Sequence, residues 1–167
     1  MSEVLPKLEL VLCVSRSGAS AERLVKRATK LGYRAQAASP DAVERADVVC
    51  TCTTASSALF DGTLLRPGAH INAVGAYKPD ARELDDATIA RAKVFVEVKE
   101  AALREAGDLR IPIEGGVLAG SDVTELGDVA GGRAPGRTEV DDVTVFKSVG
   151  VAFEDLVVAA AAVSRST

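Results

Sequence analysis

The stretch that decides the fold is LELVLCVSRSG, residues 8–18, in which an apolar run gives way to small polar residues and a glycine. The apolar part, rich in Leu and Val, predicts a buried β-strand. Ser17 or Ser20 is a suitable N-cap for the helix that follows, and Gly32 is a suitable residue to end it. The stretch therefore predicts a strand that runs directly into a helix.

The same alternation continues along the chain. Beyond the first strand at 8–14, strands are predicted at 33–37, 47–51, 70–74, 94–98 and 143–148, and helices at about 17–31, 40–45, 85–92, 99–106 and 151–164. Strands that alternate with helices require crossover connections and form a mostly parallel sheet. Because such crossovers are right-handed, we expect an α/β fold with a doubly wound, Rossmann-like sheet.

Length and composition fit one domain over residues 1–167. The chain is 47% hydrophobic and 26% charged, with a net charge of −4, an ordinary globular balance. Its segment 115–136 holds seven of the 14 glycines and is expected to be a flexible loop with a short helix near 126–130.

The negative net charge argues against nucleic acid or a membrane surface as a partner. No apolar stretch reaches the roughly 20 residues of a membrane span and no signal-peptide pattern is present, so we expect a cytoplasmic protein.

The cysteines and the single histidine predict no metal site. Cys13, Cys50 and Cys52 are odd in number and lack the spacing of a disulfide framework or a zinc knuckle. Cys13 and Cys50 stand in apolar runs, where we expect them to be buried. His70 begins a predicted strand and is expected to have a structural role.

Polar residues follow the predicted strands at the edge where ligands bind in doubly wound sheets. Arg16 lies between Ser15 and Ser17, and a cation flanked by hydroxyls beside a helix start suits the 2′-phosphate of NADP. A solvated loop with a helix cap is the alternative. Thr53 and Thr54 follow the strand at 47–51 and suit ribose or phosphate, with an ordinary ST-turn as the alternative.

Two further strand ends carry glycines. One strand ends at Gly75, and the last ends at Ser148, shortly before Gly150. Ser148 and the amides after it are suited to hold an amide or a phosphate group. Lys147 is expected to be a surface cation with a buried stem rather than a catalytic base. An acidic run is expected to be the solvated start of a helix: Asp80, Glu83, Asp85 and Asp86.

These segments, in this order, resemble the ornithine cyclodeaminase/mu-crystallin family over nearly the whole chain. The likeness is carried by Ser15-Arg16-Ser17, Ala46-Asp47-Val48-Val49 before Thr53-Thr54, Leu59-Phe60-Asp61-Gly62, His70-Ile71-Asn72-Ala73-Val74-Gly75, Lys78-Pro79-Asp80, Arg82-Glu83-Leu84, Ala106-Gly107-Asp108-Leu109, Gly136-Arg137-Thr138 and Phe146-Lys147-Ser148-Val149-Gly150. Members are NAD(P)-dependent enzymes that act on amino acids and cyclic imines.

The resemblance implies a dinucleotide site, with NADP(H) favoured over NAD(H), and an amino or imino acid substrate in a homo-oligomer. The residues implied are Ser15, Arg16 and Ser17 for the adenosine 2′-phosphate, Thr53 and Thr54 along the dinucleotide, and Val74, Gly75, Ser148 and Gly150 at the nicotinamide end. No catalytic residue is assigned.

Two departures from the family pattern refine this expectation. Tyr77 stands where cyclodeaminases carry an acid/base Asp, which favours the reductase-like branch of ketimine and pyrroline-carboxylate reductases. In addition, no glycine precedes Gly18, so the glycine-rich loop, the first strand and the substrate domain of the family are expected to be absent.

A missing central strand leaves a gap between the strands at 8–14 and 47–51. Either these two strands pair directly, or another chain supplies a strand, or the domain is unstable alone, because unpaired buried backbone groups each cost about 1–3 kcal/mol. The alternative function is therefore a non-catalytic remnant or oligomerisation module, which associates through the open sheet and the apolar helix at 151–163. A truncated form of a normal enzyme is a third interpretation.

Overall fold

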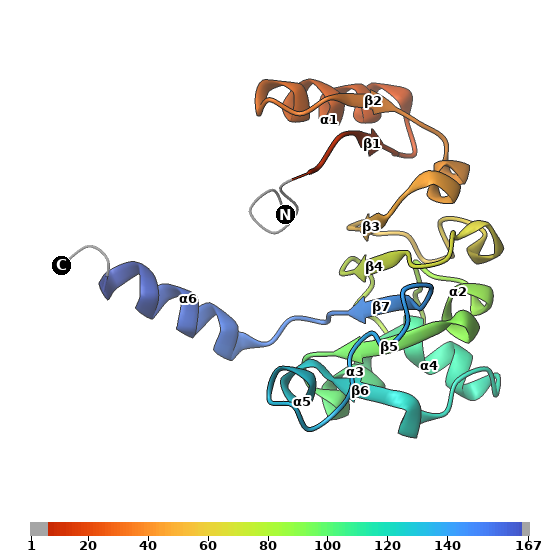
Figure 1. Cartoon of the computed structure of the whole chain (residues 1–167), viewed down its shortest axis with the longest axis vertical. Coiled ribbons are helices and arrows are strands. Elements are labelled where there is room, and N and C mark those ends of the chain that lie inside the picture. The colour runs from red at the N-terminus through yellow and green to blue at the C-terminus, as the bar shows by residue number, and fades with distance from the viewer. Residues whose placement is uncertain (1–6, 165–167) are drawn as a thin grey trace. The chain divides into compact units, whose positions relative to one another are not determined.

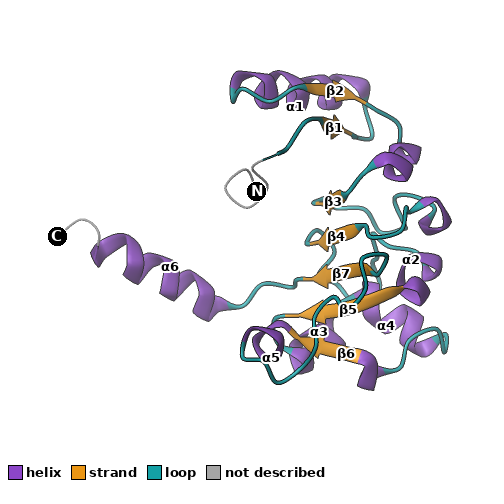
Figure 2. Ribbon diagram, in the orientation of Figure 1, coloured by secondary structure: helices purple, strands orange, loops and turns teal. Residues whose placement is uncertain are grey.

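In a computed structural model that describes residues 7–164, the chain divides into two units, Met1–Glu44 and Arg45–Thr167 (Figure 1). Both units consist of parallel strands connected by helices (Figure 2). Within residues 7–164, no helix is long and apolar enough to cross a membrane.

The first unit is the strand–helix–strand element that the sequence predicts. Strand β1 (Val11–Cys13) leads into helix α1 (Gly18–Lys30), and β2 (Ala35–Ala37) returns parallel to β1. Ser17 is the N-cap of α1, and its side chain accepts a hydrogen bond from the Ser20 amide at 3.3 Å. Gly32 follows the helix with φ +89°, a conformation in which glycine is favoured.

The second unit holds a five-stranded parallel sheet of order β3-β4-β7-β5-β6. Its strands are β3 (Val48–Thr51), β4 (His70–Ala73), β5 (Ala92–Val96), β6 (Val123–Glu125) and β7 (Val143–Lys147). The helices are α2 (Asp86–Arg91), α3 (Lys99–Glu105), α4 (Gly107–Glu114), α5 (Leu126–Ala130) and α6 (Ala152–Ser164), with short 3-10 helices η1 (Pro40–Arg45), η2 (Gly62–Leu64) and η3 (Gly120–Asp122). Parallel strands that neighbour one another out of sequence order confirm the predicted α/β class with a Rossmann-like sheet.

One face of this sheet forms the core of the second unit. Ile71, Val145 and Val94 stand in register on three neighbouring strands, and each is at most 1% exposed. Leu84 and Leu109, from the segments outside the sheet, are fully buried as well. The sheet is therefore anchored by aliphatic packing, and its carboxyl edge is held in a fixed position.

Two elements differ from the prediction. Helix α4 begins at Gly107, directly after the predicted helix at 99–106, and the segment 115–136 contains the strand β6 in addition to the predicted short helix, which is α5. A Cβ on Gly107 would lie 2.1 Å from the Ala81 carbonyl oxygen, so this glycine serves a close packing contact. The flexibility of 115–136 stays a prediction.

The predicted burial of Cys50 is wrong, although Cys13 is buried as expected. Successive residues of a strand point to opposite faces, and on β3 it is the neighbouring Thr51 that is buried. Strand β3 is also the outermost strand of its sheet, so a neighbouring strand of this sheet flanks Cys50 on one side only.

Strands β1 and β3 belong to separate sheets. They also belong to the two different units, so all three outcomes expected for a missing central strand stay predictions.

Candidate functional site

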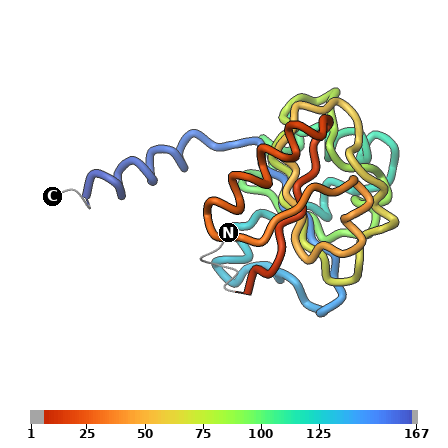
Figure 3. Tube along the Cα trace, turned by 90° about the horizontal axis from the view of Figure 1, so that it is seen from above, coloured from red at the N-terminus to blue at the C-terminus, as the bar shows by residue number. Residues whose placement is uncertain are grey.

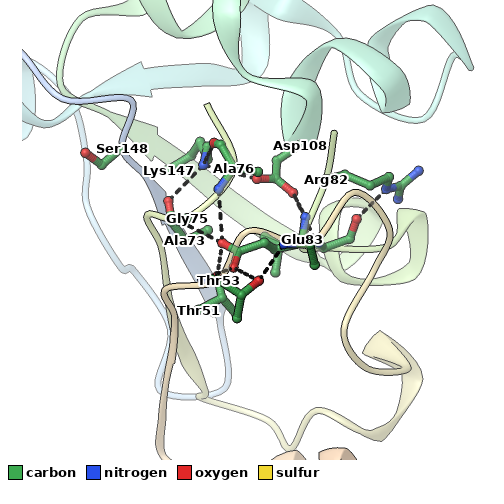
Figure 4. A network of polar contacts seen from close by, with 12 residues as sticks. Thr51, Thr53, Ala73, Gly75, Ala76, Arg82, Glu83, Asp108, Lys147 and Ser148 are labelled. Carbon is green, nitrogen blue, oxygen red and sulfur yellow. Dashed lines mark hydrogen bonds and ion pairs between the residues drawn. The ribbon is translucent and has the colours of Figure 1, made fainter. Parts of the chain in front are cut away.

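A buried polar network joins the carboxyl ends of β3, β4 and β7 (Figure 4). Its centre is Glu83, which is 0% exposed and lies in the segment between β4 and α2. The Glu83 carboxylate accepts five hydrogen bonds: from Thr51 Oγ1 (2.8 Å), Thr53 N (2.7 Å), Thr53 Oγ1 (2.7 Å), Gly75 N (2.8 Å) and Ala76 N (3.3 Å). One side chain thus holds the ends of two neighbouring strands.

These contacts keep Glu83 ionised. Burial alone would raise the pKa of Glu83, but the hydrogen bonds from the side chains of Thr53 and Thr51 and from the amides of Thr53 and Gly75 outweigh it, so the pKa lies below its usual range. An ionised carboxylate only accepts hydrogen bonds, which matches a shell made entirely of donors.

Lys147 forms the second part of the network. Its Nζ donates to the carbonyl oxygens of Ala73 (3.1 Å) and Ala76, and it lies 3.1 Å from Asp108 Oδ2. The contact with Asp108 is an ion pair rather than an aligned hydrogen bond, and Oδ2 accepts no hydrogen bond from the described residues. Both side chains are fully buried. Lys147 therefore ties the end of β7 to the end of β4 and compensates the charge of Asp108.

Asp108 connects the two parts. Its Oδ1 accepts hydrogen bonds from the amides of Glu83 (2.7 Å) and Leu84 (2.9 Å). The backbone that carries Glu83 is thus bound to helix α4, and the network runs without interruption from Thr51 to Lys147 (Figure 4).

Gly75 leaves no room for a side chain. A Cβ at this position would lie 2.3 Å from the Thr53 carbonyl oxygen and 2.4 Å from Glu83 Oε1. The structure therefore brings Thr53 and Gly75, two of the predicted site residues, into direct proximity.

The other predicted residues of the second unit lie around this network. Thr53, Thr54 and Val74 are exposed at the strand ends. Ser148 follows β7, its amide donates to the Ala73 carbonyl at 3.0 Å, and its Oγ accepts from the Gly150 amide at 3.2 Å. The ends of β3, β4 and β7 thus present six predicted residues on one edge of one sheet: Thr53, Thr54, Val74, Gly75, Ser148 and Gly150.

Ser15, Arg16 and Ser17 belong to the first unit and are exposed between β1 and α1. The Ser17 hydroxyl caps α1 and donates to Ser20 Oγ at 2.9 Å. Arg16 forms no ion pair with another residue in the described part of the chain.

Two predictions about charged residues are wrong. Lys147 is not a surface cation, and Glu83 is not part of a solvated helix start. Asp85 is partly buried, where it caps α2 and accepts from the Gly62 amide at 2.9 Å, whereas Asp80 and Asp86 are exposed as expected. Strand alternation could have revealed Lys147, since it shares a strand face with the buried Val143 and Val145. Glu83 and Asp108 stand in two of the motifs that carry the family resemblance, but no pattern of spacing or hydropathy around them predicts that they are buried.

One open pocket lies elsewhere, over the sheet. It is about 320 Å³ in volume and is lined by His70, Asn72, Phe95, Leu126 and Phe146. His70 Nδ1 is 2.7 Å from Thr144 Oγ1, and burial lowers the pKa of His70. The pocket is lined by no charged side chain, and His70 serves the packing of β4 against β7. Within residues 7–164, no group of three or more His, Cys, Asp or Glu is placed to hold a metal ion.

Comparison with known proteins gives a consistent result. The model of the ornithine cyclodeaminase/mu-crystallin family matches residues 2–166. A Delta(1)-pyrroline-2-carboxylate reductase of Bacillus cereus is 47% identical over 121 residues, which are 71% of this chain and 37% of that protein. The ketimine reductase mu-crystallin of Mus musculus is 48% identical over 120 residues, 71% of this chain and 36% of that protein.

Solved structures agree with these relatives. The Delta(1)-pyrroline-2-carboxylate reductase of Thermococcus litoralis, in complex with NADH and L-proline, has a TM-score of 0.87 and 35% identity, covering 90% of this chain and 48% of that one. The iminosuccinate reductase of Paracoccus denitrificans, in complex with NAD+, has a TM-score of 0.86 and 32% identity, covering 93% of this chain and 48% of that one. The chain thus spans about half the length of these structures and about a third of the curated relatives.

Proposed function

Because the chain belongs to the ornithine cyclodeaminase/mu-crystallin family, we propose that it provides the nucleotide-binding part of an NAD(P)-dependent reductase for amino acids or cyclic imines. The similarity to a pyrroline-carboxylate reductase and a ketimine reductase supports the reductase branch. Tyr77 supports it too, since it stands where cyclodeaminases carry an acid/base Asp and is exposed beside the network. The observation that carries the proposal is the set of strand ends held by Glu83, because this is the edge where doubly wound sheets bind ligands.

The residues at this edge fit a dinucleotide. Thr53 and Thr54 are exposed at the end of β3, where the Thr54 hydroxyl would meet ribose or phosphate, while the Thr53 hydroxyl donates to Glu83. Gly75 lets the end of β4 lie directly against Thr53 and Glu83, which fill the place of a side chain. Val74, Gly75, Ser148 and Gly150 would hold the nicotinamide end. A nicotinamide cofactor supplies or accepts the hydride, and the protein supplies its orientation. The substrate would be an amino or imino acid.

We favour NADP(H) over NAD(H) as the cofactor. Arg16 is exposed, lies between two serines and adjoins the N-terminus of α1, an arrangement that suits a phosphate dianion. The solved relatives with bound cofactor hold NADH or NAD+, so the preference depends on Arg16 and the serines beside it.

A titration of the purified chain with NADPH and with NADH tests both points, with cofactor fluorescence and thermal shift as readouts. We expect saturable binding of NADPH. Loss of a charge-assisted hydrogen bond costs about 1.5–3 kcal/mol, so Arg16→Gln should weaken NADPH by about 10- to 100-fold and leave NADH unchanged. Arg110→Gln on α4, whose arginine pairs with Glu114 at 2.9 Å, is the matched control. No response to either cofactor would contradict the proposal.

A second candidate function is oligomer assembly, and helix α6 favours it. All residues of α6 are exposed, with Phe153 at 59%, Leu156 at 71% and Val158 at 69%; in Figure 3 it is the blue helix near the C-terminus. Helices that are apolar on all sides are normally buried. A homo-oligomer that buries α6 should show concentration-dependent mass in sedimentation velocity, whereas a strictly monomeric profile at high concentration would contradict it.

A further inference from the structure

The geometry points to Glu83 as a positioning residue that clamps the ends of β3 and β4 in the shape that receives the dinucleotide. The identity of the ligand rests on the proposed function, but the clamp itself rests on the contacts of Glu83 alone.

Of the two carboxylate oxygens, Oε1 binds only the end of β3, whereas Oε2 binds residues at the ends of both β3 and β4. Oε1 accepts both the amide and the hydroxyl of Thr53, each at 2.7 Å. Oε2 accepts the amides of Gly75 (2.8 Å) and Ala76 (3.3 Å), together with the Thr51 hydroxyl (2.8 Å). A rigid planar group therefore sets the spacing between the two backbone segments.

The clamp also holds the backbone around Thr54, the exposed residue that would face the ligand. The hydroxyl of Thr53 donates to Glu83 and at the same time accepts from the Ala55 amide at 3.1 Å. The amides on both sides of Thr54 are thus bound directly or through one hydroxyl to Glu83. The backbone on both sides of Thr54 is therefore held by Glu83, which is fully buried.

The chemistry of the shell requires an ionised acid at this position. All five groups around the carboxylate donate hydrogen bonds. A glutamine of equal size would turn its NH₂ group toward backbone N–H groups, which leaves buried donors unpaired. Neutralising Glu83 should therefore release one of the two strand ends.

Glu83 itself is fixed from both sides. Its amide donates to Asp108 Oδ1 at 2.7 Å, and its carbonyl accepts from the Leu59 amide at 2.9 Å. Asp108 is held in turn by the charge of Lys147. The carboxylate is thus a stationary point from which the exposed strand ends are positioned.

Amide hydrogen exchange of the full chain tests the clamp in the Glu83→Gln variant. We expect exchange at the amides of Thr53 or Gly75 to accelerate about tenfold or more, while the core amides of Ile71 and Val145 keep their protection. Glu114→Gln, which removes an exposed carboxylate on α4, is the matched control and should change neither. Affinity for NADPH or NADH should fall about tenfold in Glu83→Gln alone.

Exchange that stays within twofold of the wild type at both amides would overturn the inference. Equal acceleration of all amides, core included, would also overturn it, because a general loss of stability is not positioning.

If Glu83→Gln does not fold, the pair Thr51→Val and Thr51→Ser tests the clamp instead. Thr51→Val removes one donor to Oε2 and should accelerate exchange at the Gly75 amide, whereas Thr51→Ser keeps the hydroxyl and should exchange like the wild type. Equal exchange in that pair would contradict the clamp. A wild-type chain that binds neither cofactor refutes the proposed function, and the exchange data still decide the clamp.

Discussion

Replacing Lys147 by Met should be among the most destabilising single substitutions in the second unit. The variant keeps an unbranched side chain but leaves Asp108 Oδ2 buried without its compensating charge, since the ammonium at 3.1 Å is its only nearby partner among the described residues. The carbonyl oxygens of Ala73 and Ala76 lose their side-chain donor as well. Breaking a buried ion pair from one side costs about 3–5 kcal/mol, a large part of the roughly 5–15 kcal/mol that keeps a domain folded.

Urea unfolding followed by circular dichroism measures this loss. With an m-value of about 2 kcal/mol/M, the midpoint should fall by about 1.5–2.5 M while m itself is unchanged. The double variant Lys147→Met/Asp108→Asn should recover about 1–3 kcal/mol, because the amide retains Oδ1 for the two backbone donors without a buried charge. A loss below about 1 kcal/mol, as at a solvent-exposed pair, or a double variant no more stable than Lys147→Met, would refute the reasoning.

Three further predictions follow from the site and the sheet. Gly75→Ala should lower the free energy of unfolding, measured with urea, by about 2 kcal/mol or more, because its Cβ would lie 2.3 Å from the Thr53 carbonyl oxygen. Gly18→Ala is the control, since a Cβ there meets nothing within 4 Å. Equal losses in the two variants would contradict the packing argument. The pKa of Glu83 is below its ordinary value of 4.5, so the folded state binds fewer protons at Glu83 than the unfolded state does. The stability that Glu83 contributes is therefore present above pH 4.5 and is lost as the pH falls through the folded pKa. Thermal melts between pH 3 and 7 should show that the melting temperature of Glu83→Gln falls less steeply with acid than that of the wild type. The lowered pKa of His70 likewise predicts a contribution to stability that is present above the ordinary pKa of 6.5 and is lost as the pH falls below that value. Between pH 5 and 7, the melting temperature of His70→Asn should therefore depend less on pH than that of the wild type. An unchanged dependence would contradict this role of His70.

Local patterns predicted the fold because each element carries its own signal. Ser17 and Gly32 delimit α1, and the alternation of apolar strands with helices is sufficient to predict a parallel sheet. Helix α4 was not predicted, because a glycine directly after a helix, such as Gly107 after the predicted helix at 99–106, commonly ends it. Its function is the close contact with the Ala81 carbonyl, which depends on residues distant in sequence.

The site was predictable in outline but not in its chemistry. The strand ends, including Thr53 and Gly75, follow from the rule that ligands bind at the carboxyl edge. The role of Glu83 depends on how the segment after β4 folds back beneath those ends, and 30 residues separate it from Thr53. Lys147 lay within reach of sequence reasoning, because strand alternation places it on the buried face.

The apolar surface of α6 also bears on how the protein behaves at the bench. Leu156 and Val163 are 71% and 69% exposed on a helix whose acidic residues, Glu154 and Asp155, lie only in its first turn. Strongly hydrated salts such as sulfate strengthen the association of apolar surfaces. Ammonium sulfate should therefore precipitate the protein at lower concentration than a variant with two α6 residues changed to Glu, and hydrophobic-interaction resin should retain it longer.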